Sequence, residues 1–524
     1  MTITKKICLA SCLAILSFYL SQTVNRTFDK GAPPMKYRHN LNGEPRNNQA
    51  RFDRKRLTCA NNTLVSIANL SRSYYVGDNL SISVIARDGW NRYKTVGEDF
   101  FIAKLYGTYP TNASTAGRVM DYGNGTYSIR FLLSWSGTLS LSVTLIHPSE
   151  AVQVLKRIHD TYAERRVMSC DFIDTEKSFS ERTKCRHKHI KPYFRNTCNF
   201  SKPSVNGTWY CMQPKRASCD SISKCQRDEA ATEKLQNAML TPEERRLFTR
   251  SLLYREIPNS IKITVHGTGI KSETPDRSLS PCGPNLKETE SEGYWYNGTW
   301  QSSRCFIRRL NLSKVYKCLE NKSIFFQGDS TLGQWYFFLK SLVHGIDIPL
   351  KDKTSEGPIK AANYKKNITV HFRFHHLPIN RPYPFEANRL HYVADEIDKI
   401  DGGKNIVIVL GLWAHFAAES IDIFRSRLYG IRHAIIRLHR RSPDTKVIWR
   451  TSNTREHSTI GHYLENSDWF AFKLLEVTKL ILGDLKIAIL DVWDMSVCQW
   501  HKHLCHPPKD VIKNHIDLLL SYIC

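Results

Sequence analysis

One stretch near the middle of the chain, from Ile324 to Trp335, constrains the fold more than any other. Its first three residues are apolar and predict a short buried strand, and Gly328-Asp329 predicts a turn directly after it. From Ser330 onward, apolar residues recur with helical spacing. The sequence therefore predicts a strand, a tight turn and a helix, with a serine where the helix begins.

A serine at such a turn has two interpretations. Its hydroxyl would stand above the edge of the sheet, beside N–H groups of the first helical turn that can stabilise an oxyanion, as a nucleophilic serine requires. The simpler interpretation is that Asp329 or Ser330 only caps the helix, since both residue types cap well. The turn alone favours the helix cap, so evidence for a nucleophilic serine has to come from other parts of the chain.

The region from 291 to 524 reads as one α/β domain. Alternating strands and helices of these lengths predict a parallel, doubly wound sheet, in which sites form at the carboxyl ends of the strands. Ser330, Gly411, Asn453 and Asp491 fall at such ends. The expected strands are 324–326, 368–374, 406–410, 447–450 and 487–490, and the expected helices are 331–343, 390–400, 417–440, 467–482 and 509–522.

The two regions before this domain differ in texture. Residues 57–160 show period-two alternation with frequent turn signals, which predicts an immunoglobulin-like β-sandwich followed by a helix from Glu150 to Thr161. Residues 161–290 hold six closely spaced cysteines, which predict a loop-rich subdomain stapled by disulfides and followed by a linker. One strand, Ile261–Val265, is expected there.

The first 56 residues predict entry into the secretory pathway. Lys5 and Lys6 precede an apolar run over 7–20, so 1–22 is either a signal peptide or a short type II membrane anchor, and 23–56 reads as a polar stem or propeptide. The basic run at 51–56 is either a processing site or a solvated edge. Glycosylation sequons agree with a lumenal or secreted protein; they lie at Asn25, Asn61, Asn69, Asn79, Asn112, Asn124, Asn199, Asn206, Asn297, Asn311, Asn321 and Asn367.

The net charge limits the classes of binding partner, and the cysteine content predicts disulfides. The formal net charge of +26 points to anionic partners, and a secretory compartment removes nucleic acid from that group, leaving acidic glycans and membrane surfaces. Of 15 cysteines, Cys8 and Cys12 lie in the leader, which leaves 13 that should mostly pair, with one free or intermolecular thiol. Metal ligation is the weaker alternative because paired C-x-x-C spacing is missing, so no metal is expected.

The last loop, from Asp491 to Pro508, supplies candidates for a base and its orienting acid. It contains His501, His503 and His506 together with Asp491 and Asp494. A serine triad needs a histidine to accept the hydroxyl proton and an acid to hold the imidazole in the right tautomer. A histidine in such a loop is more often structural. Its occurrence together with the Gly-Asp-Ser turn favours a catalytic site.

These segments resemble a known family. The stretch 121–131 with His147-Pro-Ser-Glu150 resembles a filamin-type repeat and, more closely, the neurexophilin domain. Phe326–Ser330, Gly411–Phe416 and the Cys524 ending resemble the PC-esterase domain, a GDS/L-type esterase fold. The chain as a whole is similar to the neurexophilin and PC-esterase domain (NXPE) family. The resemblance implies Ser330 as nucleophile, His506 as base, and the N–H groups of Ser330 and Gly411 as oxyanion donors.

At the acid the chain departs from that fold's pattern. The usual Asp-x-x-His block reads His503-Leu-Cys-His506 here, so Asp494 or Asp491 would have to substitute, or the domain is a Ser–His dyad or an inactive relative. The usual Gly-x-Asn-Asp block is also absent, so its asparagine donor is missing, and His415 is an alternative donor.

The resemblance implies transfer of acyl groups, such as acetyl, to glycan hydroxyls in the Golgi lumen or after secretion. The acceptor would be a glycan or glycoprotein; sialic acid would suit the positive charge. No bound cofactor is expected, although the acyl donor is open and acetyl-CoA is one candidate. The rival is a secreted binding protein whose sandwich engages an extracellular receptor and whose esterase-like domain is inactive.

Overall fold

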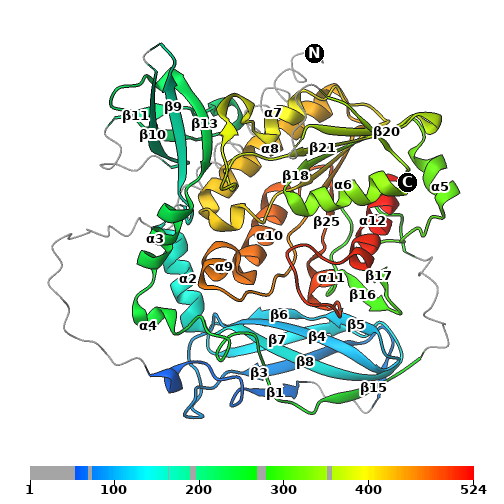
Figure 1. Cartoon of the computed structure of the whole chain (residues 1–524). Helices are drawn as coiled ribbons and strands as arrows, with labels where there is room; N and C mark the ends of the chain where they lie inside the picture. Colours follow the sequence, from blue (N-terminus) through cyan, green and yellow to red (C-terminus); the bar gives the residue numbers. More distant parts are fainter. Residues whose placement is uncertain are drawn as a thin grey trace, which may run out of the picture. The chain divides into compact units, whose positions relative to one another are not determined.

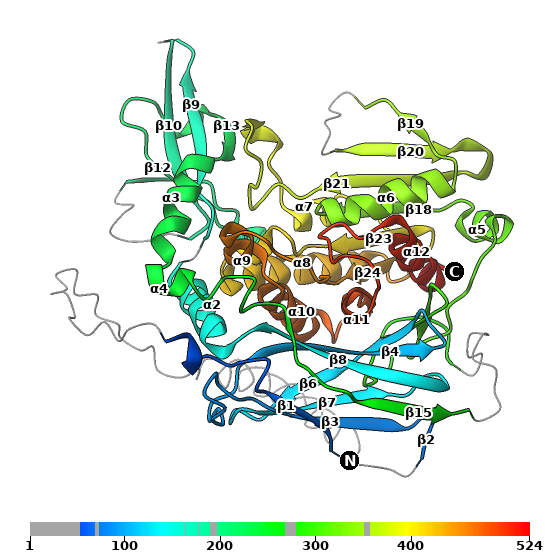
Figure 2. The same cartoon turned by 60° about the horizontal axis from the view of Figure 1, so that its bottom comes forward.

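The structure, a computed structural model, describes residues 53–68, 73–162, 164–176, 178–188, 196–267, 279–350 and 357–524. Asp53–Cys524 form one compact unit (Figures 1 and 2). The predicted leader at 1–22, nearly all of the predicted stem, and the sequons at Asn25 and Asn69 lie outside the described residues.

Two antiparallel sheets share a hydrophobic core near the start of the described chain. Alternating residues of β3 (Asn79–Ile85) and β7 (Thr126–Leu132) are buried, as period-two patterning predicts. They pack against β4 (Phe100–Tyr109) and β8 (Gly137–His147) of the second sheet. The first sheet has the order β1-β3-β7-β6, with β1 at Leu64–Ile67 and β6 at Arg118–Asp121. The immunoglobulin-like topology stays a prediction.

The second sheet includes strands from far along the chain. Its order is β17-β16-β5-β4-β8-β15-β2, with β14 also paired to β8. The hairpin β16–β17 lies beyond residue 290, so the expected α/β segment contributes to the sandwich. The strands are β2 (Tyr74–Tyr75), β4 (Phe100–Tyr109), β5 (Ala113–Ala116), β8 (Gly137–His147), β14 (Arg255–Glu256), β15 (Lys262–His266), β16 (Gly293–Tyr296) and β17 (Thr299–Ser302).

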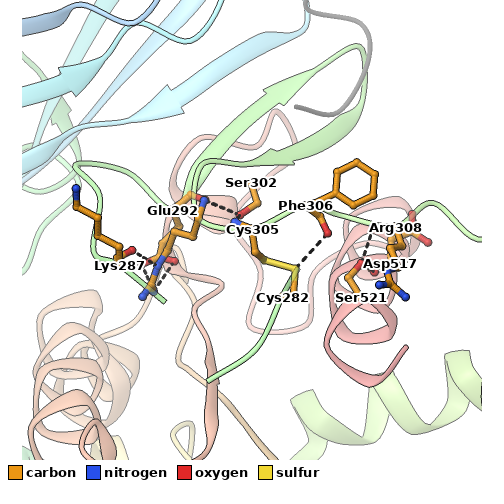
Figure 3. Close-up of a disulfide and its surroundings, with 10 residues drawn as sticks. Cys282, Lys287, Glu292, Ser302, Cys305, Phe306, Arg308, Asp517 and Ser521 are labelled. Carbon is orange, nitrogen blue, oxygen red and sulfur yellow. Dashed lines mark hydrogen bonds and ion pairs between the residues drawn. A yellow bond between two sulfur atoms is a disulfide. The ribbon is translucent and has the colours of Figure 1, made fainter. Parts of the chain in front are cut away.

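The hairpin is fastened at its base to the C-terminal helix. Cys282 and Cys305 form a disulfide around it, and the Cys305 N–H donates to Ser302 Oγ (Figure 3). Arg308 N–H then donates to Ser521 Oγ of α12 (Lys509–Ile523). The connection therefore joins the β-sandwich to the end of the α/β region.

The cysteine-rich region is a sheet rather than the loop-rich subdomain that the sequence predicts. Six antiparallel strands run in the order β11-β12-β10-β9-β13-β22, and pairing along strands satisfies the backbone that loops would leave free. The bounds are β9 (Met168–Asp174), β10 (Phe179–Arg186), β11 (Thr197–Asn199), β12 (Tyr210–Met212), β13 (Ile222–Arg227) and β22 (Phe385–Glu386), and helices α2 (Ser149–Thr161), α3 (Glu229–Met239) and α4 (Pro242–Arg245) flank it in sequence.

The α/β region contains all five predicted parallel strands. They are β18 (Ser323–Gly328), β21 (Ile368–Phe374), β23 (Ile406–Gly411), β24 (Lys446–Arg450) and β25 (Ala488–Leu490). Two further strands, β19 (Ile346–Ile348) and β20 (Ile359–Asn363), add to one edge in antiparallel fashion, so the sheet is mixed and not wholly parallel as expected.

The strand order locates the expected binding edge. The sheet runs β19-β20-β21-β18-β23-β24-β25, so the chain first steps to one side of β18 and then to the other. In open α/β sheets, ligands bind where the order reverses, at the carboxyl ends of the strands, here between β18 and β23.

Eight helices accompany this sheet in the described chain. Five match the predicted helices, whereas α5, α9 and α11 are additional. Among the helices of the described residues, none is both long enough and apolar enough to cross a membrane. The eight are α5 (Leu312–Leu319), α6 (Ser330–Leu342), α7 (Val393–Asp398), α8 (Ile421–Arg441), α9 (Ile460–Asn466), α10 (Asp468–Leu482), α11 (Trp493–Val497) and α12.

Ten cysteines form five disulfides and three described cysteines are free, so the expectation of a single unpaired thiol is wrong. The free thiols are Cys59, Cys498 and Cys505. The sulfurs of Cys170, Cys185 and Cys211 lie close enough together for a metal, but all three are already in disulfides. The pairs are Cys170–Cys225, Cys185–Cys211, Cys198–Cys219, Cys282–Cys305 and Cys318–Cys524.

Candidate functional site

Ser330 begins α6 immediately after β18, as the strand–turn–helix pattern predicts. The turn requires glycine at position 328, since an added Cβ there would lie 2.0 Å from the Gly411 carbonyl oxygen. Asp329 caps the helix, with one carboxylate oxygen accepting from the Thr331 N–H at 3.0 Å. The capping interpretation of the turn is therefore correct for Asp329, and it leaves the Ser330 hydroxyl available.

Asp329 also holds the neighbouring loop. Its other carboxylate oxygen accepts from the N–H groups of Trp413 and Ala414, at 3.1 and 3.0 Å. The side chain is fully buried, and charge-assisted bonds of this kind are among the stronger ones in proteins. Asp329 thus fixes the loops after β18 and β23 together, at the point where the strand order reverses.

His506 is in contact with Ser330. Its Nε2 lies 2.8 Å from Ser330 Oγ, a normal hydrogen-bond length. Ser330 is half-buried and His506 is exposed, so the pair is accessible from solvent. Ser330 lies near the start of the α/β region and His506 near its end, and the fold brings them together as a nucleophile–base pair.

The backbone on both sides of His506 is held by side chains from the sheet and from α6. Asn453, just after β24, donates its amide to the Cys505 carbonyl at 3.4 Å. Gln334, one turn into α6, donates to the Pro507 carbonyl at 3.1 Å. We call Asn453 and Gln334 the His506 clamp. It ties the backbone around His506 to α6, which carries Ser330, and to the loop after β24.

The acids expected to orient His506 have other partners. Asp494 accepts from the Glu292 N–H at 2.8 Å and from the Ser291 hydroxyl, and Asp491 forms an ion pair with Lys479 at 2.7 Å. In the part of the chain that the structure describes, no carboxylate forms a hydrogen bond or ion pair with His506. The assignment of Asp494 as the orienting acid is therefore corrected: α11 and β25 direct it toward the β16 hairpin.

The other two histidines of the last loop are also engaged elsewhere. His501 contacts Asp510 at 2.6 Å, and His503, which stands at the family's acid position, contacts the Thr454 hydroxyl at 2.8 Å. Neither has Ser330 as a partner. Of the three candidate histidines, only His506 is in contact with the nucleophile.

The surroundings of His506 favour its neutral form. His506 is exposed, but the residues around it remove part of its water, and this desolvation lowers the pKa of His506 below its ordinary value. The Asp329 carboxylate opposes the lowering, whereas Arg450 and Arg455 add to it. A neutral imidazole is the form that can accept the Ser330 proton. The electrostatic setting thus suits a general base at neutral pH.

The two predicted oxyanion donors lie at the same edge of the sheet. Ser330 is the first residue of α6, where N–H groups have no intrahelical partner. Gly411 is paired with Gly328, and its carbonyl accepts from the Asp329 N–H at 3.1 Å. His415, the alternative donor, is buried nearby with an unpaired Nδ1. Their roles in stabilising an oxyanion stay predictions.

Comparison with known families matches the two parts of the chain separately. Residues 82–238 match the model described as "Neurexophilin", and residues 300–524 match the model described as "NXPE family member 4-like, C-terminal domain". The chain belongs to the NXPE family. The second match covers Ser330, His506 and the His506 clamp. For this NXPE protein, the neurexophilin match and the five disulfides fit the secretory pathway.

The glycosylation predictions for this NXPE protein are compatible with surface positions. Nine of the ten described sequon asparagines are exposed, and Asn206 is half-buried. Asn367 donates to the Asn321 side chain at 2.9 Å, so these two sequon asparagines are neighbours on the surface. Whether these asparagines carry glycans stays a prediction.

Three residues at the NXPE site were not identified by their roles from sequence. Arg450 is fully buried beside the pair, bonded to Asn453, with Nε and Nη1 unpartnered. The sequence predicted Asn453 at a strand end but assigned it no function. It predicted Gln334 only as part of the helix at 331–343. The available signal was the polar run that begins at Arg450, the last residue of a predicted strand, and continues to Asn453.

Proposed function

We propose that this NXPE protein transfers an acyl group, such as acetyl, to hydroxyl groups of glycans. The observation that carries the proposal is the 2.8 Å contact between Ser330 Oγ and His506 Nε2 at the binding edge of an α/β sheet. His506 accepts the Ser330 proton while Ser330 Oγ bonds to the acyl carbon of the donor. His506 then returns the proton to the leaving group, which departs as a thiol if the donor is acetyl-CoA.

The second half of the reaction repeats these roles in reverse. A glycan hydroxyl loses its proton to His506 Nε2 and attacks the acyl-serine carbonyl. The ester bond to Ser330 breaks, Ser330 Oγ takes the proton back, and the acylated sugar leaves. The N–H groups of Ser330 and Gly411 would stabilise the oxyanion in both halves. No metal or bound cofactor enters these steps.

The His506 clamp supports this chemistry without an orienting acid. In a serine triad the carboxylate fixes the tautomer and orientation of the imidazole. Here Asn453 and Gln334 hold the carbonyls of Cys505 and Pro507, which restricts where the His506 ring can lie. We infer a Ser–His dyad in which backbone anchoring replaces part of the carboxylate's task.

The acceptor is proposed to be a glycan for two reasons. The pair is solvent-accessible, which suits a hydroxyl on a large glycoconjugate. Arg455 is half-buried and acts electrostatically on His506, and its charge favours an acidic sugar such as sialic acid. The secretory compartment supplies such glycans.

The direct test is glycan O-acylation in cells. Cells that lack the protein would be complemented with the wild-type chain or with Ser330→Ala, and ester-linked acetyl groups on released glycans would be measured by mass spectrometry. The proposal expects the wild type alone to raise O-acetylation. Equal O-acetylation with both chains, at equal secretion, would overturn it.

A second candidate is a secreted binding protein with an inactive esterase-like domain. It is favoured by one observation: within the described residues, no carboxylate is bonded to His506. In that case Ser330→Ala would leave both glycan O-acylation and binding to an extracellular receptor unchanged. Loss of O-acylation in Ser330→Ala would reject it as the sole function.

A further inference from the structure

A basic and aromatic surface lies on the β-sandwich and takes no part in the proposed chemistry. It is formed by Arg54, Lys55, Arg87, Trp90 and Tyr93, which we call the basic–aromatic patch. Trp90 is 52% exposed and Tyr93 is 65% exposed, although both are large rings that proteins usually cover. Such residues, gathered with cations on one surface, mark a site of interaction.

Backbone contacts hold the two segments of the basic–aromatic patch together. Arg54–Arg56 form a short 3₁₀ helix capped by Asp53, and the Lys55 carbonyl accepts from the Gly89 N–H at 2.7 Å. An added Cβ on Gly89 would lie 2.9 Å from the Lys55 Cα, so the helix and the loop 87–93 are in close contact. Arg54–Arg56, the described end of the basic run, is therefore anchored against the sandwich.

Cations and rings alternate across the patch. Lys55 Nζ lies 4.4 Å from the centre of the Trp90 ring, and the Arg87 guanidinium lies 4.5 Å from that of Tyr93. Arg87 also donates to the Tyr93 hydroxyl at 3.0 Å. These contacts hold the side chains in place, since cations favour the faces of aromatic rings, but they leave the positive charge uncompensated.

Charge pairing separates the patch from its neighbours. Arg56 and Arg92 next to it form ion pairs with Asp53 and Asp88. Among the described residues, no carboxylate lies within ion-pair distance of Arg54, Lys55 or Arg87. The positive charges of these three side chains are therefore available to an anionic partner.

We propose that the basic–aromatic patch binds an acidic polysaccharide. Sulfate and carboxylate groups would pair with Lys55 and Arg87, and the C–H faces of the sugar rings would lie on the negative faces of Trp90 and Tyr93. An acidic peptide would use the cations but has less need of two exposed rings. In the secretory pathway, acidic glycans are the abundant polyanions that combine both features.

The test uses heparin as the probe and the full secreted chain. Binding is measured by titration over a range of salt concentrations, because release of counterions makes log K fall linearly with log salt. The double variant Lys55→Ser/Arg87→Ser should bind roughly fivefold or more weakly at low salt and lose about two units of salt slope. Trp90→Ala should weaken binding with little change in slope.

Matched controls keep the result interpretable. Lys365→Ser/Lys486→Ser removes two exposed lysines elsewhere, and Lys55→Arg/Arg87→Lys keeps the charge of the patch; both should bind like the wild type. Thermal unfolding shows whether each variant is folded. Equal weakening by the Lys365/Lys486 pair would overturn the proposal, as would unchanged binding by the patch variants. Binding of polyglutamate in preference to heparin would overturn the choice of a polysaccharide.

Discussion

Ser330 and His506 are 176 residues apart in sequence, yet Ser330 Oγ and His506 Nε2 lie 2.8 Å apart. Each reaches this position through a different element. Ser330 is placed by the turn between β18 and α6, and His506 by a loop that is anchored to β24 and α6. The relationship therefore depends on the packing of the whole α/β region.

The His506 clamp should be needed for turnover. We expect Asn453→Ala and Gln334→Ala each to lower kcat, by up to about 10²-fold if the imidazole moves by about 1 Å, with a smaller effect on the KM for the acceptor. Steady-state kinetics with a model glycan acceptor would measure this. Asn405→Ala, at the amino end of β23, is the matched control and should keep wild-type turnover. Unchanged kcat in both clamp variants would show that His506 is held by other means.

Asp494→Asn should not behave like the loss of a triad acid, which costs about 10⁴ in turnover in a well-studied triad. Asp494 bonds to Ser291 and Glu292, so we expect the change mainly to lower the thermal stability and to leave kcat within about tenfold of wild type. Thermal unfolding and kinetics on the same sample separate the two effects. A loss near 10⁴ in a folded variant would restore Asp494 to the site.

The rate should depend on pH through His506. Only the neutral imidazole accepts a proton, so kcat/KM should rise with pH through the pKa of His506 and level off near neutrality. Because partial desolvation, Arg450 and Arg455 lower that pKa, the midpoint should lie below 6.5. Arg455→Gln removes one positive charge and should move the midpoint upward, whereas Lys365→Gln should not. A midpoint above 6.5 in the wild type would contradict this assignment.

The disulfide between Cys318 and Cys524 should stabilise the site as well as the fold. It joins residues 206 apart and fixes the end of α12, the helix that follows the His506 loop. Changing both cysteines to serine should lower the free energy of unfolding by about 2–5 kcal/mol, because a long loop in the unfolded chain is no longer closed. Chemical denaturation would measure this. An unchanged midpoint of unfolding would show that α12 is held by packing alone.

Sequence patterns predicted the parts of the fold that depend on local order. The five parallel strands and their helices follow from apolar runs and helical periodicity, and the Gly-Asp-Ser turn predicted the position of Ser330. Strands β19 and β20 were missed because short antiparallel edge strands lack a continuous apolar run. The cysteine-rich sheet was missed for a similar reason, since its strands are short and polar.

Long-range contacts were the harder part of the site. His506 could be named from the resemblance, but the direction of Asp494 depends on how α11 packs against the β16 hairpin, which no local pattern encodes. Asn453 and Gln334 each look like ordinary polar residues at a strand end and in a helix. Their role appears only when the loop at 504–507 is folded against both.

The central claim is that Ser330 becomes acylated. The full secreted chain would be incubated with isotopically labelled acetyl-CoA and, separately, with an activated acetyl ester that does not depend on donor recognition, then quenched in acid and digested for mass spectrometry. The account predicts an acetyl group on Ser330 in the wild type, none there in Ser330→Ala, and a much reduced amount in His506→Ala. Wild-type protein with no acetyl on Ser330 from either donor would contradict it.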